Sequence, residues 1–217
     1  MPEPHFELTT TAPVNASVQG TATLGSNLSF GEQNVFVLPI QRLGKTVTIV
    51  QLAGTVEDSV THDLSFLRLA DGPLEPGTYE VGLDAPRCDS PCGPSFVPDE
   101  LFTASYGRQT ADSLHFYPLK EGTVAVETAT DEVVEGTFSL DAAMEASVSR
   151  ADMQAFRDSL REGPPSDSTD VPRPPEPTVT PLEPPMVIEG SFTATPGTLS
   201  NQVTRPQWSV SGDILAP

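Results

Sequence analysis

Gly122-Thr-Val-Ala-Val-Glu127 and Val133-Val-Glu-Gly-Thr-Phe-Ser-Leu140 flank the acidic turn Ala129-Thr-Asp-Glu132, and this stretch decides the fold. Apolar and polar residues alternate along both runs, with Val124 and Val126 on one side of the first run. Alternation with a period of two residues is the pattern of a strand that buries one face. The stretch therefore predicts a β-hairpin with one face against a core.

A glycine-centred pattern recurs along the chain: an apolar residue, any residue, glycine, a small or polar residue, then an apolar or small one. The first, third and fifth residues of a strand share a face, so each glycine is expected between two inward apolar side chains. A glycine there leaves room for an aromatic ring from a neighbouring strand. The alternative, a backbone that approaches a ligand closely, stays open. The segments are Val18-Gln-Gly-Thr-Ala22, Leu52-Ala-Gly-Thr-Val56, Val134-Glu-Gly-Thr-Phe138, Ile188-Glu-Gly-Ser-Phe192 and Val210-Ser-Gly-Asp-Ile214.

Short alternating runs separated by proline and glycine extend over most of the 217 residues. They predict an all-β protein, an antiparallel β-sandwich or barrel of about 8 to 12 strands. We expect residues 1–13 to be an irregular lead-in and residues 14–217 to form a single β domain. Because Val187-Ile-Glu-Gly-Ser-Phe-Thr193 repeats the pattern of Val133–Ser139, both segments are expected to face one interior.

Two segments depart from the strand pattern. Residues 149–163 predict a short helix, with Ser149 as the N-cap and Gly163 as the stop. We expect this helix to lie over a sheet edge or a barrel mouth; docking of a partner is the alternative. Residues 164–185 contain nine prolines and predict a disordered or polyproline-like linker. The apolar residues at helical spacing are Met153, Phe156 and Leu160.

Charge narrows the range of partners. The chain has 11 basic and 30 acidic residues, a formal net charge of −19. Phosphate backbones and anionic membranes require clustered positive charge, so nucleic acid and membrane surfaces are not expected partners. No apolar run is long enough to predict a transmembrane segment. A solvated acidic surface suited to a secretory or high-salt setting is the expectation, with envelope proteins or glycans as partners; cation binding is the alternative.

The only cysteines, Cys88 and Cys92, lie in the proline-rich loop Arg87-Cys-Asp-Ser-Pro-Cys-Gly-Pro94. Two thiols in so short a loop favour a local disulfide, which predicts an oxidising, extracytoplasmic compartment. A zinc site is disfavoured because further ligands are missing nearby. A thioredoxin-like redox motif is disfavoured because three residues, not two, separate the cysteines.

Catalytic motifs are missing from the sequence: it has no nucleophile elbow, metalloprotease motif, phosphate-binding loop or EF-hand spacing. Of the histidines, His62 is expected in a turn and His115 on the solvent face of a strand. No cofactor is expected, although calcium is a weak possibility at predicted acidic turns. These turns are Glu57-Asp58, Asp131-Glu132 and residues 84–89.

Aromatic residues offer one candidate binding surface. Amphipathic rings exposed together on strands could stack on sugars. The alternative is that the same rings fill the core, since only 6% of the residues are aromatic. The candidate residues are Tyr79, Tyr106, Tyr117 and Trp208.

The order of Gly77-Thr-Tyr79, Glu121-Gly-Thr-Val-Ala-Val126, Val134-Glu-Gly-Thr-Phe-Ser139 and Ile188-Glu-Gly-Ser-Phe192 resembles bacterial cell-envelope β domains. These domains of unknown function, often lipoproteins, carry Gly-Thr-rich hairpins. The resemblance covers the second half of the chain and Gly77–Val81, and implies export but no catalytic residues. Two features depart from it: Met1-Pro-Glu-Pro-His5 shows neither leader nor lipobox cysteine, and the helix and proline-rich segment interrupt the last strands.

The sequence therefore predicts a non-catalytic, extracytoplasmic bacterial module that is secreted, periplasmic or surface-anchored. Its expected role is structural or in interaction with other envelope components. The alternative is a module that binds glycans or small ligands through exposed tyrosine and tryptophan rings. A hydrolase is a more distant alternative.

Overall fold

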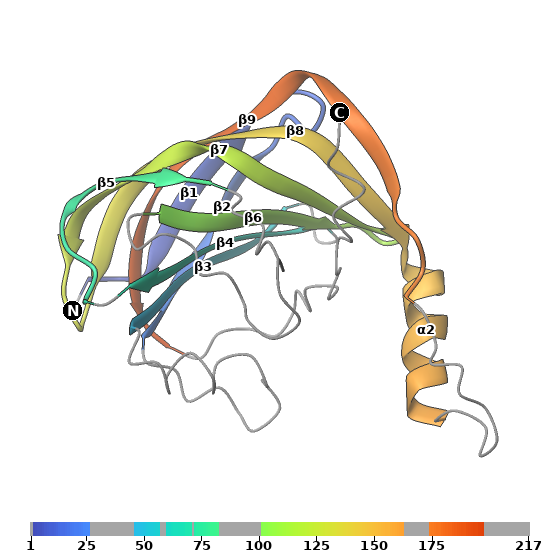
Figure 1. The fold of residues 1–217 in the computed structure, drawn as a ribbon, viewed down its shortest axis with the longest axis horizontal. Coiled ribbons are helices and arrows are strands. Elements are labelled where there is room, and N and C mark those ends of the chain that lie inside the picture. The colour runs from blue at the N-terminus through green and yellow to red at the C-terminus, as the bar shows by residue number, and fades with distance from the viewer. Residues whose placement is uncertain are drawn as a thin grey trace, which may run out of the picture.

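The computed structural model describes residues 2–26, 46–56, 60–70, 72–82, 101–162 and 174–197. Strands dominate these residues, with one helix after β8 (Figure 1). The elements are β1 (His5–Thr10), β2 (Ser17–Ser26), β3 (Thr46–Val56), β4 (Val60–Ala70), β5 (Gly77–Val81), β6 (Leu101–Gln109), β7 (Ser113–Ala129), β8 (Val134–Ser149), α2 (Arg150–Glu162) and β9 (Thr178–Pro196).

The strands form a closed barrel in the order β1-β2-β3-β4-β6-β5-β7-β8-β9, and β9 pairs with β1 to complete the ring. Neighbours are antiparallel except for β5 and β6 and a short contact of β2 with β9. Strands β6 and β7 pair directly from Ala104 to Gln109, and β5 lies between them where they separate. The all-β prediction is confirmed.

The predicted hairpin is present as the pair β7 and β8, whose turn closes with a hydrogen bond from Thr130 N to the Val133 carbonyl. Strand β9 is the other neighbour of β8, with Leu140 opposite Ile188 and Gly136 opposite Phe192. The two segments predicted to share one interior therefore do so.

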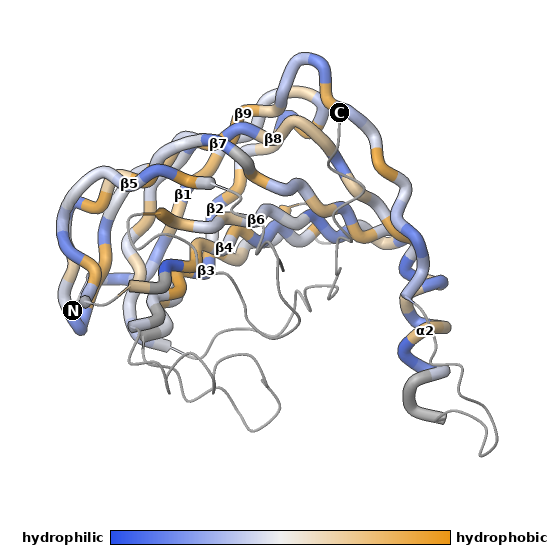
Figure 2. Tube along the Cα trace, viewed as in Figure 1, coloured by the Kyte–Doolittle hydropathy of each residue, from blue (hydrophilic) through white to orange (hydrophobic). Residues whose placement is uncertain are grey.

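Inward side chains fill the barrel, and hydrophobic and hydrophilic residues alternate along the strands (Figure 2). At the centre, the ring of Phe66 lies 5.3 Å from that of Phe138 and 6.0 Å from that of Phe192. Phe102 meets Phe66 edge-on at 6.2 Å. Eight-stranded barrels are just wide enough for side chains to fill, and here four phenylalanines from different strands occupy the middle.

Glycines make room for these rings, as the recurring pattern predicts. A Cβ atom at Gly190 would lie 2.7 Å from the ring of Phe138, and one at Gly20 would lie 2.7 Å from the ring of Phe6. At Gly136 the ring of Phe192 would be 3.3 Å away. Real Cβ atoms do not tolerate the shorter distances, so the pattern is a packing device. Val210–Ile214 lies outside the described residues.

The prediction of an irregular lead-in over residues 1–13 is wrong for His5–Thr10, which is β1. Its burial alternates strictly, with Phe6 and Leu8 buried. The strand joins β2 to β9 and so closes the ring. Prolines flank this segment but do not interrupt it, which leaves its backbone free to pair on both sides.

The prediction of a linker over residues 164–185 is wrong for its last part, because Thr178–Pro185 belongs to β9. There β9 pairs with β8, for example Val179 with Ala146. Strand β1 joins β9 only from Ile188 onward, so among the described residues the earlier part has one strand neighbour. Proline is tolerated on an edge because its missing N–H faces away from the ladder.

Helix α2 begins as predicted. The Ser149 hydroxyl accepts hydrogen bonds from the backbone N–H groups of Ala151 (3.2 Å) and Asp152 (3.5 Å), which is an N-cap. The expected position over a sheet edge or a barrel mouth is wrong: α2 continues from β8 and extends away from the barrel (Figure 1). Met153 in its first turn is buried, whereas Gln154 and Arg157 are exposed.

Candidate functional site

The register brings polar side chains together inside the barrel, at the end where β8 meets α2. His62 on β4 lies opposite Arg108 on β6, which lies opposite His115 on β7. One position deeper, Tyr106 on β6 lies opposite Tyr117 on β7. With Glu145 on β8, these residues form what we call the interior network.

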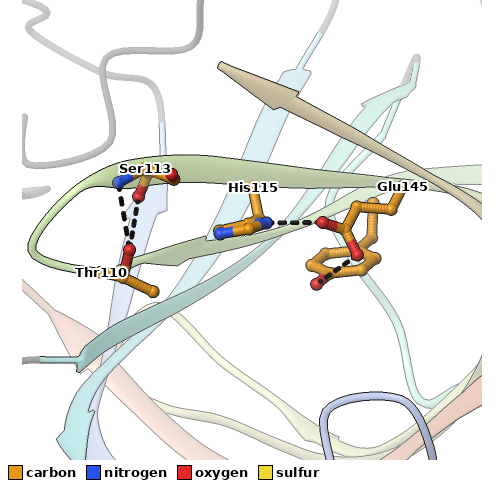
Figure 3. A network of polar contacts seen from close by, with 5 residues as sticks. Thr110, Ser113, His115 and Glu145 are labelled. Carbon is orange, nitrogen blue, oxygen red and sulfur yellow. Dashed lines mark hydrogen bonds and ion pairs between the residues drawn. The ribbon is translucent and has the colours of Figure 1, made fainter. Parts of the chain in front are cut away.

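Contacts in the interior network run across four strands. His62 Nδ1 lies 2.5 Å from the Tyr106 hydroxyl, and the two tyrosine rings are 5.3 Å apart. In the other half, Glu145 Oε1 lies 2.5 Å from His115 Nδ1 (Figure 3). Glu145 Oε2 accepts a hydrogen bond of 3.2 Å from the Tyr117 hydroxyl. Both oxygens of the carboxylate therefore have partners.

Burial sets the charge states of the network. Burial, together with the smaller effect of the nearby Arg108 guanidinium, lowers the pKa of His62 to about 4. Burial also raises the pKa of Tyr106 and Tyr117 well above the usual value for a phenol. At neutral pH the network therefore holds an uncharged imidazole and two protonated phenols, which suits hydrogen bonding between strands more than nucleophilic attack.

Two predictions about these histidines are wrong. His62 lies within β4 and is 2% exposed, and His115 points inward instead of to solvent. The outward positions beside His115 are Leu114 and Phe116, which are half-buried, and Leu114 lies opposite the buried Val148. The outer surface near the start of α2 is therefore apolar. A prediction that assigns the apolar residues of β7 to the inward face is wrong there for this reason.

The three tyrosines differ in how deeply they are buried. Tyr106 and Tyr117 are fully buried, so for these two residues the alternative of core packing is confirmed and the hypothesis of an exposed sugar-stacking platform is wrong. Tyr79 is half-buried: its ring meets Phe102 edge-on at 5.4 Å, and its hydroxyl donates a hydrogen bond of 2.7 Å to the Glu75 carbonyl. Trp208, Cys88 and Cys92 lie outside the described residues.

A surface groove of about 330 Å³ lies at the opposite end of the barrel from the interior network. Four neighbouring strands, β7, β8, β9 and β1, form it. We call it the outer groove. Its lining residues are His5, Glu127, Glu135, Gly136, Thr137, Ser191, Phe192 and Thr193.

Strand pairing brings polar side chains together at the outer groove. His5, Thr193 and Glu135 lie opposite one another on β1, β9 and β8. The ladder of β7 and β8 is irregular between Val126 and Thr128, so Glu127 is an extra residue at a β-bulge. Bulges redirect side chains, and here the bulge adds a second carboxylate to the groove.

Thr193 is the most enclosed polar residue of the outer groove. It is 8% exposed, and its hydroxyl has no hydrogen-bond partner among the described residues. The hydroxyl oxygen keeps some contact with solvent, and its two acceptor lone pairs are available to a donor that enters the groove. Glu135 lies outward because its neighbours Val134 and Gly136 are buried, but the bulge at Glu127 and the pairing with β9 and β1 have no sequence signal.

Within the described ranges, no three His, Cys, Asp or Glu side chains are grouped so as to hold a metal ion, and Asp131-Glu132 falls in those ranges. Residues 57–58 and 84–89 lie outside them. None of the described helices has the length and apolarity needed to cross a bilayer.

Known proteins provide no direct guide to this arrangement. Comparisons with protein-family models, with curated proteins and with solved structures each find no match.

Proposed function

We propose that the protein is a non-catalytic, extracytoplasmic module of the bacterial cell envelope that binds a positively charged partner. The binding surface is the outward side of β1, β2, β8 and β9, which we call the acidic face. None of these four strands contains a lysine or arginine. The outward carboxylates of the acidic face are Glu7, Glu135, Asp141, Glu183 and Glu189.

The observation that carries the proposal is the contrast between the two sides of the sheet. The inward side is filled by rings and aliphatic side chains. The outward side carries carboxylates whose contacts come from neutral donors: Gln19 to Glu7 at 3.0 Å, and Ser139 to Glu189 at 3.2 Å. Charges that lack opposite charges nearby attract a cationic partner and steer its approach. The cysteine loop and the resemblance to envelope domains support the location.

Salt should stabilise the protein if the acidic face carries uncompensated charge. We expect the melting temperature to rise by about 5 °C between 0.05 M and 1 M NaCl, because salt screens repulsion between carboxylates. The triple variant Glu7→Gln, Asp141→Asn, Glu189→Gln should show a smaller rise. Differential scanning calorimetry makes the measurement, and a melting temperature that stays flat or falls with salt would count against uncompensated repulsion.

Binding to a defined polycation tests the acidic face itself. The same triple variant should bind immobilised poly-L-lysine about threefold to tenfold more weakly than the wild type at 0.15 M NaCl, because three attractive charges are removed. Surface plasmon resonance over a salt series gives the affinities.

The matched control has the same change in net charge elsewhere. Glu75→Gln, Glu80→Gln, Asp112→Asn removes three exposed carboxylates outside the acidic face. It should bind polylysine more tightly than the face variant. Equal weakening in the two triple variants would show that net charge alone governs binding, and the acidic face would lose its role.

A further inference from the structure

We infer that the outer groove is the docking site for a single primary ammonium group, that of a lysine side chain on the partner. This inference rests on the proposed function, since it names the contact that anchors a cationic partner. The groove has its own residues and does not include Glu7, Asp141 or Glu189. It can therefore be tested separately from the rest of the acidic face.

Two carboxylates make the groove negatively charged. Glu127 from the β-bulge and Glu135 from β8 both line it, and its lining contains no lysine or arginine. Like charges in a shared groove repel one another, and a cation between them converts that repulsion into attraction. Both side chains reach solvent, so an incoming ammonium group can reach them without unfolding the strand ends.

Thr193 supplies the observation that is independent of charge. Its residue is more than nine-tenths buried, it lines the groove, and its hydroxyl has no partner among the residues that the structure describes. A hydroxyl oxygen carries two acceptor lone pairs. An N–H donor entering the groove would satisfy this oxygen, which no described side chain does.

His5 adds a further acceptor at the rim. Its Nδ1 lies 2.9 Å from the Glu3 carbonyl, and because a carbonyl only accepts, the proton is on Nδ1. In the neutral ring this leaves Nε2 with a free lone pair. The groove thus offers acceptors from β1, β7, β8 and β9.

The number and arrangement of acceptors favour ammonium over guanidinium. An ammonium group is a compact charge with three donors, which can point to acceptors on three different strands. Guanidinium is planar and prefers two parallel bonds to one carboxylate. In the groove, Glu127, Glu135 and Thr193 come from β7, β8 and β9, a convergent set that suits three diverging donors.

The first experiment titrates the wild type with n-butylammonium chloride and follows backbone amide shifts by NMR. Saturable shifts at Glu127, Glu135 and Thr193 are expected. Thr193→Val, which keeps the shape and removes the hydroxyl, should weaken binding about threefold to tenfold. The control Thr9→Val removes an exposed hydroxyl from the same side of the sheet outside the groove and should leave binding unchanged.

Carboxylate variants and a second probe sharpen the test. Glu135→Gln should weaken butylammonium binding about tenfold or more, whereas Glu189→Gln, outside the groove, should change it little. n-Butylguanidinium should bind more weakly than butylammonium. Tighter binding of guanidinium, no saturable shift, or an equal effect of Glu189→Gln and Glu135→Gln would overturn the inference.

The outcomes separate this inference from the proposed function. If butylammonium fails to bind while the Glu7, Asp141, Glu189 triple variant still loses polylysine affinity relative to its control, the groove assignment fails alone. If butylammonium binds as expected but the two triple variants bind polylysine equally, the broader acidic face fails and the groove remains.

Discussion

Replacing Gly190 with alanine is expected to destabilise the barrel by about 3 kcal/mol, at the upper end of overpacking effects. The new Cβ atom would lie 2.7 Å from the Phe138 ring and 3.0 Å from Leu8 Cα, and it would also meet the Glu7 carbonyl oxygen. Two of these three neighbours are backbone atoms of β1. A side chain can rotate away, but β1 can move only by giving up its pairing with β9.

Urea unfolding of Gly190→Ala against the wild type measures this effect. The control Gly77→Ala adds the same methyl group where the nearest neighbour would be a Tyr79 ring atom at 3.8 Å, and it should change stability little. The double variant Gly190→Ala, Phe138→Leu should recover less than half of the loss, because the backbone contacts remain. A Gly190→Ala protein as stable as the wild type would contradict the packing role of these glycines.

Acidification should remove stability through His62. Its ordinary pKa of 6.5 applies in the unfolded chain, and the folded barrel lowers it to about 4 by burial and by the charge of Arg108. Between these values the unfolded chain binds a proton that the folded chain does not. The free energy of unfolding therefore falls as the pH drops from 6.5 to 4, and the loss reaches about 3 kcal/mol at pH 4.

The measurement compares wild type and His62→Gln by urea unfolding at pH 7.5 and pH 4. Other groups titrate in both proteins and cancel in the difference. The stability advantage of the wild type over the variant should shrink by about 3 kcal/mol at pH 4. An advantage independent of pH would mean that the buried His62 accepts a proton as readily as the unfolded chain.

Local patterns predicted most of the fold because they follow from the period of a strand. The hairpin of β7 and β8 and the shared interior of Val134–Leu140 and Ile188–Thr193 required only alternation. The cap at Ser149 required only local hydrogen bonding. In contrast, the sequence does not predict β1, because the flanking prolines indicate an irregular segment despite the short alternation at Phe6 and Leu8. The strand forms because it pairs with β2 on one side and with β9 on the other.

The candidate sites depend on long-range register, which one sequence does not reveal. His62 and Tyr106 are 44 residues apart, yet their side chains meet because β4 pairs with β6. To predict that His115 points inward, one must know that the outward side of the sheet is covered near Val148. The outer groove joins residues that are far apart in the sequence, since Thr193 pairs with His5.

The prolines of β9 have a further consequence for behaviour at high protein concentration. Pro181, Pro184 and Pro185 lie in the part of β9 before Ile188, which does not pair with β1 among the described residues, and a proline has no N–H group to offer an approaching chain. Exposed strand edges otherwise recruit identical edges and seed fibrils. At high salt concentration, electrostatic repulsion between copies is screened, and these three prolines then protect the strand edge against aggregation.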